Sequence, residues 1–322
     1  MKLNQKYNRR DFTKITTLGT LGALPIISSA SNVLAGFETP KKLQVFVFSK
    51  CLQFLDYNEL CEVVKEMGFD GIDLTVRPKG HVLPENVTTD LPKATKLMQK
   101  YGLVPGMLST NVKDANSALD QKVLEVAKDL GYTCYRTGWL KYPKDKSLKE
   151  ATQVFESQLK ALEALNEKLG ITGGYQNHAG HYFGAPIWDL KPVFEKFSPQ
   201  HLGVQYDIMH ATVEGAQSWQ LGFEHILPQI NSIVVKDFKW IQKDDGKWKR
   251  KYTPMGEGMV DFDKYFKLLK KHQVDLPVSL HVEYELGGAE KGRIPTIDKQ
   301  IIFDALKKDL TFLRNTWKNT TP

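Results

Sequence analysis

The stretch "HLGVQYDIMHATVEG", residues 201–215, joins a short strand pattern to the start of a helix. Residues 202–206 are largely apolar, as expected for a strand buried on both faces, and Asp207 and His210 arrive where the strand should end. A carboxylate and an imidazole at this place either cap the next helix or belong to a functional site. The rest of the sequence favours a functional site.

The same order of strand and helix occurs eight times along the chain. Amphipathic helical patterns separate eight β-rich runs, at residues 43–49, 68–76, 102–110, 131–139, 170–178, 201–209, 230–238 and 276–284. This repetition predicts a (β/α)₈ TIM barrel, an α/β fold of one domain. A doubly wound open sheet would show a glycine-rich turn after its first strand, and none follows Phe48.

The first 35 residues have the pattern of an export signal. Arg9 and Arg10 precede a weakly hydrophobic run over residues 15–34, and Val33, Leu34 and Ala35 offer a small-residue cleavage site. The pattern resembles a bacterial twin-arginine signal and predicts a periplasmic protein with a mature domain over residues 36–322. A disordered or helical N-terminal arm is the alternative.

The composition excludes several classes of function. The net charge of +7 includes five Lys/Arg and one Asp in the first 35 residues, so the mature domain carries about +3 and no nucleic-acid partner is expected. No later stretch is long and apolar enough to span a membrane. Three widely spaced cysteines do not predict a disulfide framework.

Polar residues gather at the ends of the predicted strands, where TIM barrels carry their chemistry. A single convergent site explains them together, although ionic layers inside the barrel would explain one or two. The residues are Asp73, Thr75, Arg136, Gln176, His178, Gln205, Asp207, Lys236, His281, Glu283 and Glu285.

Four of the candidate side chains form an oxygen and nitrogen donor set. Asp207, Glu283, His178 and His210 are ligand types that Mn²⁺, Mg²⁺, Co²⁺ or Zn²⁺ accepts, so the sequence predicts a divalent metal. Three of them have a structural alternative: His210 caps a helix, Glu283 pairs with Lys236 or Arg293, and His178 is a core histidine.

Five motifs carry a resemblance to a known family: "GFDGIDLTV", "YQNHAG", "YDIMHA", "VVKDFKW" and "HVEYELGG". Over about residues 43–315 the chain resembles the sugar isomerase/epimerase family with the xylose-isomerase-like barrel. Metal-dependent members take ligands from a Glu on strand five, an Asp on strand six, a His on strand seven and a Glu on strand eight. The resemblance implies that Asp207 and Glu283 are ligands and that His210 contacts the substrate.

Two positions depart from this family pattern. Gln176 stands where the family has the strand-five Glu, and Val234 stands where it has the strand-seven His, with Lys236 on the same strand face. The expected metal set is therefore Asp207 and Glu283, with Gln176 binding through its carbonyl oxygen and His178 as a replacement ligand.

The resemblance implies proton abstraction next to the carbonyl of a sugar. Export favours a non-phosphorylated sugar or glycoside as the partner, and the catalytic candidates are Glu283, His210, Lys236 and His178. Because neutral Gln176 removes one carboxylate of the epimerase pair, a lyase that performs β-elimination on 3-keto sugars or glycosides is the alternative. A non-catalytic sugar-binding barrel is a third hypothesis. Apurinic-site endonucleases share the barrel, but their denser His/Glu set is absent.

Further residues are predicted to bind the substrate. The loop over residues 77–87 and the long basic, aromatic segment over residues 239–258 are expected near the mouth of the barrel, and a homodimer is possible. The substrate-binding candidates are His81, Arg136, Trp139, Gln176, Trp240, His281 and Arg293.

Overall fold

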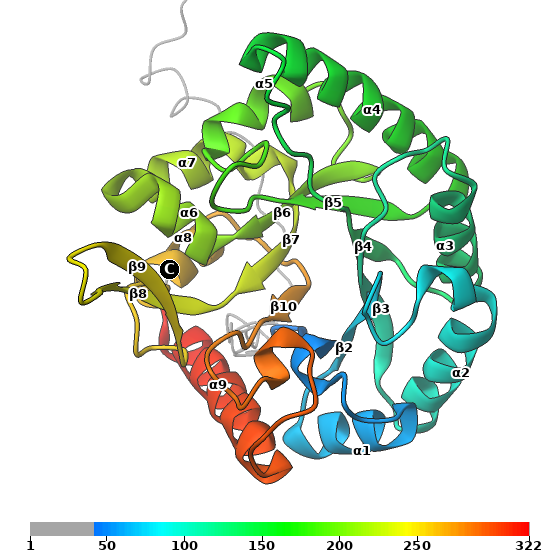
Figure 1. The fold of residues 1–322 in the computed structure, drawn as a ribbon, viewed down its shortest axis with the longest axis vertical. Helices are drawn as coiled ribbons and strands as arrows, with labels where there is room; N and C mark the ends of the chain where they lie inside the picture. The colour runs from blue at the N-terminus through cyan, green and yellow to red at the C-terminus, as the bar shows by residue number, and fades with distance from the viewer. Residues whose placement is uncertain (1–41, 322) are drawn as a thin grey trace, which may run out of the picture. The chain divides into compact units, whose positions relative to one another are not determined.

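Eight parallel strands close into a barrel in the computed structural model of the chain, which describes residues 42–321 (Figure 1). Around the barrel the order is β1-β10-β7-β6-β5-β4-β3-β2, so the predicted TIM barrel is confirmed. The predicted signal segment lies outside the described residues. The barrel strands are β1 (Val45–Phe48), β2 (Gly71–Val76), β3 (Val104–Thr110), β4 (Cys134–Arg136), β5 (Thr172–Gln176), β6 (Leu202–Asp207), β7 (Ile230–Val235) and β10 (Val278–Leu280).

Helices surround the barrel and complete its βα units (Figure 1). None of the helices within residues 42–321 is long and apolar enough to cross a membrane. The α-helices are α1 (Tyr57–Met67), α2 (Val87–Lys100), α3 (Ala118–Asp129), α4 (Leu148–Leu169), α5 (Lys191–Phe194), α6 (Ile208–Gly215), α7 (Trp219–Ile226), α8 (Phe262–Lys271) and α9 (Lys299–Asn319).

Local sequence signals explain where the helices begin and end. Ser147 and Glu150 form a reciprocal capping box at the start of α4. Gly68 and Gly170 end α1 and α4 in the left-handed conformation, with φ of 90° and 66°, which a residue without Cβ adopts at no steric cost.

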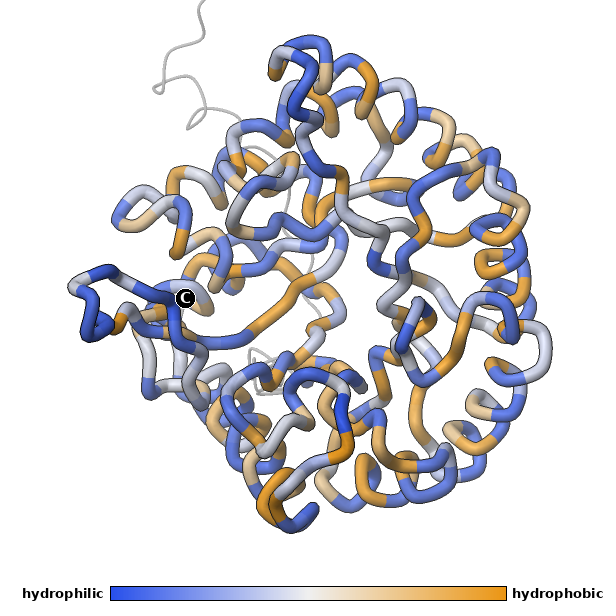
Figure 2. The backbone as a smooth tube through the Cα atoms, in the orientation of Figure 1, coloured by the Kyte–Doolittle hydropathy of each residue, from blue (hydrophilic) through white to orange (hydrophobic). Residues whose placement is uncertain are grey.

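The barrel interior is closed below the mouth by an aromatic ring. Phe46 is 1% exposed, and a Cβ at Gly71 or Gly106 would lie 2.7 Å from its ring carbons, so the two glycines make room for it. Figure 2 shows apolar residues along the strands and on parts of each surrounding helix. Burial of these faces is the main force that holds the barrel together.

The segment after β7 forms an antiparallel hairpin that the sequence did not predict as strands. The run predicted over residues 230–238 splits, because β7 ends at Val235 and β8 (Asp237–Gln242) begins a pair with β9 (Trp248–Thr253). The hairpin is strongly hydrophilic in Figure 2. It projects from the barrel instead of continuing it.

The helix predicted after β5 is also interrupted. The pattern over residues 187–197 forms a 3₁₀ turn at Ile187–Asp189 and the short helix α5. Pro192 explains the break, because it lacks the N–H group that a continuous helix would need there.

Candidate active site

Lys236 connects two carboxylates at the carboxyl end of the barrel. Its Nζ lies 3.2 Å from Asp207 Oδ2 and 2.9 Å from Glu283 Oε2, and Lys50 Nζ lies 2.9 Å from Glu283 Oε1. The side chain of Asp207 is fully buried and that of Lys236 is 4% exposed, whereas Glu283 is 14% exposed. The site therefore has a buried floor, with Glu283 as its accessible carboxylate.

Asp207 both caps a helix and belongs to the site. Its Oδ1 accepts a hydrogen bond from the backbone N–H of His210, 3.1 Å away, at the start of α6. Its Oδ2 accepts one from Nε2 of Gln176, 2.7 Å away. The two interpretations of the end of strand six are therefore compatible, because each uses a different oxygen.

Burial and charge together set the protonation states. Burial lowers the pKa of Lys236, but Asp207 and Glu283 raise that pKa by more, so the ammonium is retained. Burial also opposes the ionised form of Glu283, yet Lys236 and Lys50 hold its pKa well below the ordinary value. Burial raises the pKa of Asp207 despite the nearby ammonium. At neutral pH the accessible pair is an ammonium and a carboxylate.

A divalent ion does not fit the predicted ligand set as these side chains lie. The Lys236 ammonium holds the carboxylate oxygens that a bridging cation would need, and two unit charges about 4 Å apart repel by roughly 4 kcal/mol at an effective dielectric of about 20. The carbonyl oxygen of Gln176 faces Arg136 Nη1 at 3.4 Å, contrary to its predicted role as a ligand. Within residues 42–321, no cluster of three or more His, Cys, Asp or Glu side chains is arranged to hold a metal.

Two histidine rings lie against each other beside this centre, with their planes tilted by 40°. The ring centroids of His178 and His210 are 4.1 Å apart, and His178 also contacts Trp139 and Tyr182. Burial lowers the pKa of His178 to about 4 and takes that of His210 well below its ordinary value, so both rings are neutral at pH 7. His210 is fully buried without a ring hydrogen bond, whereas His178 is half-buried and accessible.

A polar layer lies deeper in the barrel. Asp73 Oδ2 accepts hydrogen bonds from Ser279 at 2.6 Å and Ser109 at 3.1 Å. His281 stacks on Phe48 with centroids 4.0 Å apart, and its Nε2 is 3.9 Å from Asp73 Oδ2. The side chain of His281 is 3% exposed and belongs to this layer, and its role in substrate binding stays a prediction.

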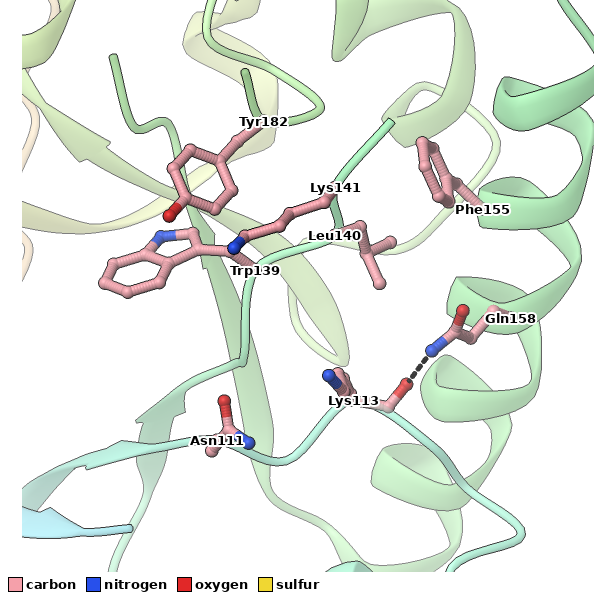
Figure 3. A pocket seen from close by; sticks show the side chains of 8 residues that line it. All are labelled: Asn111, Lys113, Trp139, Leu140, Lys141, Phe155, Gln158 and Tyr182. Atoms are coloured by element: carbon pink, nitrogen blue, oxygen red, sulfur yellow. Dashed lines mark hydrogen bonds between the residues drawn. The ribbon is translucent and has the colours of Figure 1, made fainter. Parts of the chain in front are cut away.

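Two adjoining pockets open beside Trp139. One of about 540 Å³ is lined by side chains that include Trp139, Lys141 and Tyr182, with the two rings side by side (Figure 3). Two other lining residues are joined by a hydrogen bond, which Gln158 donates to the backbone oxygen of Lys113 (Figure 3). The second pocket, of about 370 Å³, shares Trp139 and also contains Arg136. Both residues therefore line a pocket, and their binding of a substrate stays a prediction.

Three predicted substrate-binding residues lie elsewhere. Both ring nitrogens of His81 are engaged inside the protein, Nδ1 with Ser49 Oγ and Nε2 with the backbone oxygen of Leu52, so His81 fixes the loop after β2. Trp240 is 41% exposed on the hairpin, and Arg293 is exposed on the loop before α9. Neither Trp240 nor Arg293 lines the two pockets beside Trp139.

Lys50 is a site residue that is not among the predicted ones, and Tyr252 lies beside Lys236. Lys50 lies two residues beyond the last residue of β1, so the alternation used for the other strands would have found it. The ring centroid of Tyr252 lies 5.8 Å from Lys236 Nζ. The β8–β9 hairpin places Tyr252 beside Lys236, and no periodic pattern in the sequence predicts this position.

Comparisons with known proteins agree on the architecture. The family model described as "Xylose isomerase-like TIM barrel" matches residues 61–303. No curated protein matches the chain. Among solved structures, the 3-keto-D-glucoside 4-epimerase from E. coli has 14% identity and a TM-score of 0.62, covering 85% of this chain and 100% of its own.

Two further solved structures share the fold. The probable 3-DHS dehydratase AsbF from Bacillus anthracis has 14% identity and a TM-score of 0.61, covering 84% of this chain and 98% of its own. A xylose isomerase-like protein from Mycobacterium smegmatis in complex with magnesium has 14% identity and a TM-score of 0.57, covering 83% and 98%. With the closed barrel and the matched residues 61–303, the chain belongs to the xylose isomerase-like TIM barrel family.

Proposed function

We propose that the chain is an exported, isomerase- or epimerase-like enzyme that removes a proton next to the carbonyl of a non-phosphorylated sugar or glycoside. The observation that carries this proposal is the Lys236 ammonium between Asp207 and Glu283 at the mouth of the barrel. The 3-keto-D-glucoside 4-epimerase with the same fold supports it. The ammonium takes the place of the divalent metal that the sequence predicts.

The reaction uses the positive charge of the Lys236 ammonium and the negative charge of the neighbouring Glu283 carboxylate. The carbonyl oxygen of the sugar accepts a hydrogen bond from the Lys236 ammonium, and Glu283 takes the proton from the adjacent carbon. The C–H electron pair moves toward the carbonyl oxygen, where Lys236 stabilises the enolate. Lys236 then shares its N–H groups with the substrate, so the pKa of Glu283 rises toward the ordinary carboxyl range and its basicity increases.

The fate of the enolate separates the possible products. Return of the proton to the opposite face of the same carbon gives an epimer. Return of the proton to the former carbonyl carbon gives an isomer, provided that the hydroxyl on the adjacent carbon passes its proton to the former carbonyl oxygen and becomes the new carbonyl. Departure of a group from the β-carbon with its bonding electron pair gives an unsaturated product. An enzyme that releases this product is a lyase, which is the second candidate function. Gln176 favours the lyase because it is neutral and offers no second carboxylate from β5.

Solvent-hydrogen exchange tests the common step without knowledge of the product. The protein is incubated in D₂O with a panel of keto sugars and 3-keto glycosides, and mass spectrometry detects deuterium at the carbon next to the carbonyl. We expect exchange by the wild type, and a decrease of at least about 100-fold in Lys236→Met because the enolate loses its charge partner. Lys239→Met, an exposed lysine on β8, is the matched control and should exchange normally.

Metal analysis accompanies this exchange experiment. Exchange that survives EDTA, in protein without stoichiometric metal, supports the ammonium-based reaction. One Mn, Co, Mg or Zn per chain that is lost in both Asp207→Ala and Glu283→Ala would instead restore the metal-assisted mechanism. Sugar binding without exchange by any panel member would leave a non-catalytic binding barrel. Sedimentation of the purified protein tests the predicted homodimer.

A further inference from the structure

The pocket of about 370 Å³ beside the reaction centre has an unusual charge. Five of its nine lining residues are cationic and none is acidic, among the residues 42–321 that the structure describes. The cations are Lys50, Arg77, Lys79, Arg136 and Lys291. Neutral sugars need hydroxyl-binding amides and carboxylates, so a lining of this kind is better suited to an anion.

Three of these cations, Arg77, Lys79 and Arg136, form no ion pair within 4 Å with any residue in the described part of the chain. Arg136 is 2% exposed; its Nη2 donates to the backbone oxygen of Thr110 at 3.0 Å and its Nη1 to Gln176 at 3.4 Å, while its Nε has no partner. Burial first, and then the charge of Arg77, lower the pKa of Arg136 to about 9, although Asp73 and Glu283 act in the opposite direction. The two guanidinium groups repel each other, and an anion bound between them would reduce this repulsion further.

The guanidinium groups are held in place before any ligand arrives. The Cζ of Arg136 lies 4.3 Å from the ring centroid of Trp139, and that of Arg77 lies 5.3 Å from the ring centroid of Phe48. The turn that follows Arg77 is fixed by the Gly80 N–H, which donates to the Arg77 oxygen at 2.8 Å. Such preorganisation lowers the entropic cost of binding.

The pocket and the reaction centre share Lys50. Its Nζ pairs with Glu283 Oε1 at 2.9 Å, and the same side chain lines the cationic pocket. The cationic pocket is therefore in direct contact with Glu283 through Lys50.

We infer that this pocket binds a negatively charged oxygen group of the substrate, a carboxylate or a phosphate, so that the enzyme acts on an acidic sugar. The inference rests on the proposed function for the reaction itself but concerns a separate part of the site. The planar fork of Arg77 and Arg136 matches the two oxygens of either group. Lys79 and Lys291, at the exposed rim, attract the anion before it docks.

Binding of unreactive probes tests the inference without turnover. Calorimetry compares D-glucuronate, D-glucose 6-phosphate and D-glucose with the wild-type protein at low and high salt. We expect the favoured anion to bind at least about tenfold more tightly than glucose, with the difference reduced by salt. If glucuronate binds more tightly than the other two probes, the substrate class is a sugar acid. If glucose 6-phosphate binds most tightly, the anion site is supported, but the non-phosphorylated substrate of the proposed function is contradicted.

Variants of the pocket provide the control. Arg77→Gln should bring the affinity for the anion close to that for glucose, and Lys79→Gln, at an exposed position, should weaken anion binding by a smaller factor without risk to folding. Lys96→Gln, exposed on α2 and outside the pocket, should have no effect. Equal binding of all three sugars by the wild type, or anion binding unchanged in both pocket variants, would overturn the inference. Because no turnover is needed, absence of deuterium exchange would affect only the proposed reaction.

Discussion

Lys236 gives this barrel a chemistry that its family relationship alone does not indicate. Val234 is fully buried and pairs in register with Asp207 and Ser279, so the position at which the resemblance implies a metal-binding histidine carries no donor atom. Two residues further along the chain, the Lys236 ammonium reaches both Asp207 and Glu283. In the proposed reaction, Lys236 supplies the positive charge that a metal ion provides in the mechanism implied by the resemblance.

A second residue, Asp309 on α9, predicts how stability depends on pH. Burial raises its pKa to about 7, and the smaller effects of Lys308 and Glu257 have opposite signs. Between the unfolded pKa near 4 and the folded pKa near 7, the folded protein keeps a proton that the unfolded chain has released, so stability falls as pH rises through this range.

Asp309→Asn should remove this pH dependence. Its amide oxygen can still accept the hydrogen bond from the Met255 N–H, 3.2 Å away in the wild type. We expect wild-type stability to fall by on the order of 3 kcal/mol between pH 5 and pH 8 from this group, and the variant to lose much less. Urea unfolding at both pH values measures the difference, with Asp304→Asn, exposed on the same helix, as control. Identical pH slopes in all three proteins would contradict the assignment.

At the scale of elements, the β8–β9 hairpin is built around Asp237. Its Oδ1 accepts from the N–H groups of Phe238 and Val260, and its Oδ2 from those of Gly256 and Gly258, at 2.8–3.1 Å. A Cβ at Gly258 would lie 2.2 Å from Asp237 Oδ1, so only glycine allows this approach. The carboxylate thus connects the start of the hairpin to the segment that follows β9 and fixes the strand that carries Tyr252.

Asp237→Ala should release the hairpin from the barrel. Four backbone N–H groups lose their acceptor, and we expect the free energy of unfolding to fall by about 3 kcal/mol. Loss of Tyr252 next to Lys236 should also lower deuterium exchange. Thermal unfolding and limited proteolysis measure the first effect. Asp245→Ala, at the exposed hairpin turn, should change neither quantity, and a proteolytically resistant Asp237→Ala hairpin would contradict the role of Asp237.

At the scale of the whole molecule, positive charge gathers where the substrate enters. The mature domain is expected to carry only about +3, yet five cations line one pocket at its mouth. Such a distribution raises the local concentration of anions and speeds their association. The proposed location outside the cytoplasm makes free acidic sugars accessible to this pocket.

Export itself is tested on the full chain. Replacement of both Arg9 and Arg10 by Lys should leave an uncleaved precursor in the cytoplasm of a bacterial host, because the twin-arginine pair is what the export machinery reads. The wild type should appear in the periplasm with a mass that corresponds to cleavage after Ala35. Cell fractionation and mass spectrometry measure both, and Lys2→Arg is the control. Periplasmic protein in equal amount from the Arg9/Arg10 variant would contradict the signal assignment.

The sequence by itself determined the barrel and most members of the site. Strand ends in a parallel barrel meet on one side, so the positions of Asp207, Lys236 and Glu283 at the ends of their strands were enough to predict that they converge. Four glycines stand in the sequence between a helical pattern and the next strand pattern, and all adopt positive φ: Gly68, Gly102, Gly131 and Gly170. These features depend on local residue types and on the two-residue alternation of strands, and both can be read directly from the sequence.

Only the tertiary structure decided how the converging groups pair. The direction of each side chain depends on neighbours far apart in sequence: His281 turns to Phe48, His81 to Ser49, and the carbonyl oxygen of Gln176 to Arg136. The position of Lys236 between two carboxylates depends on packing and on charges from residues far apart in the chain. Such contacts leave no periodic pattern in the sequence.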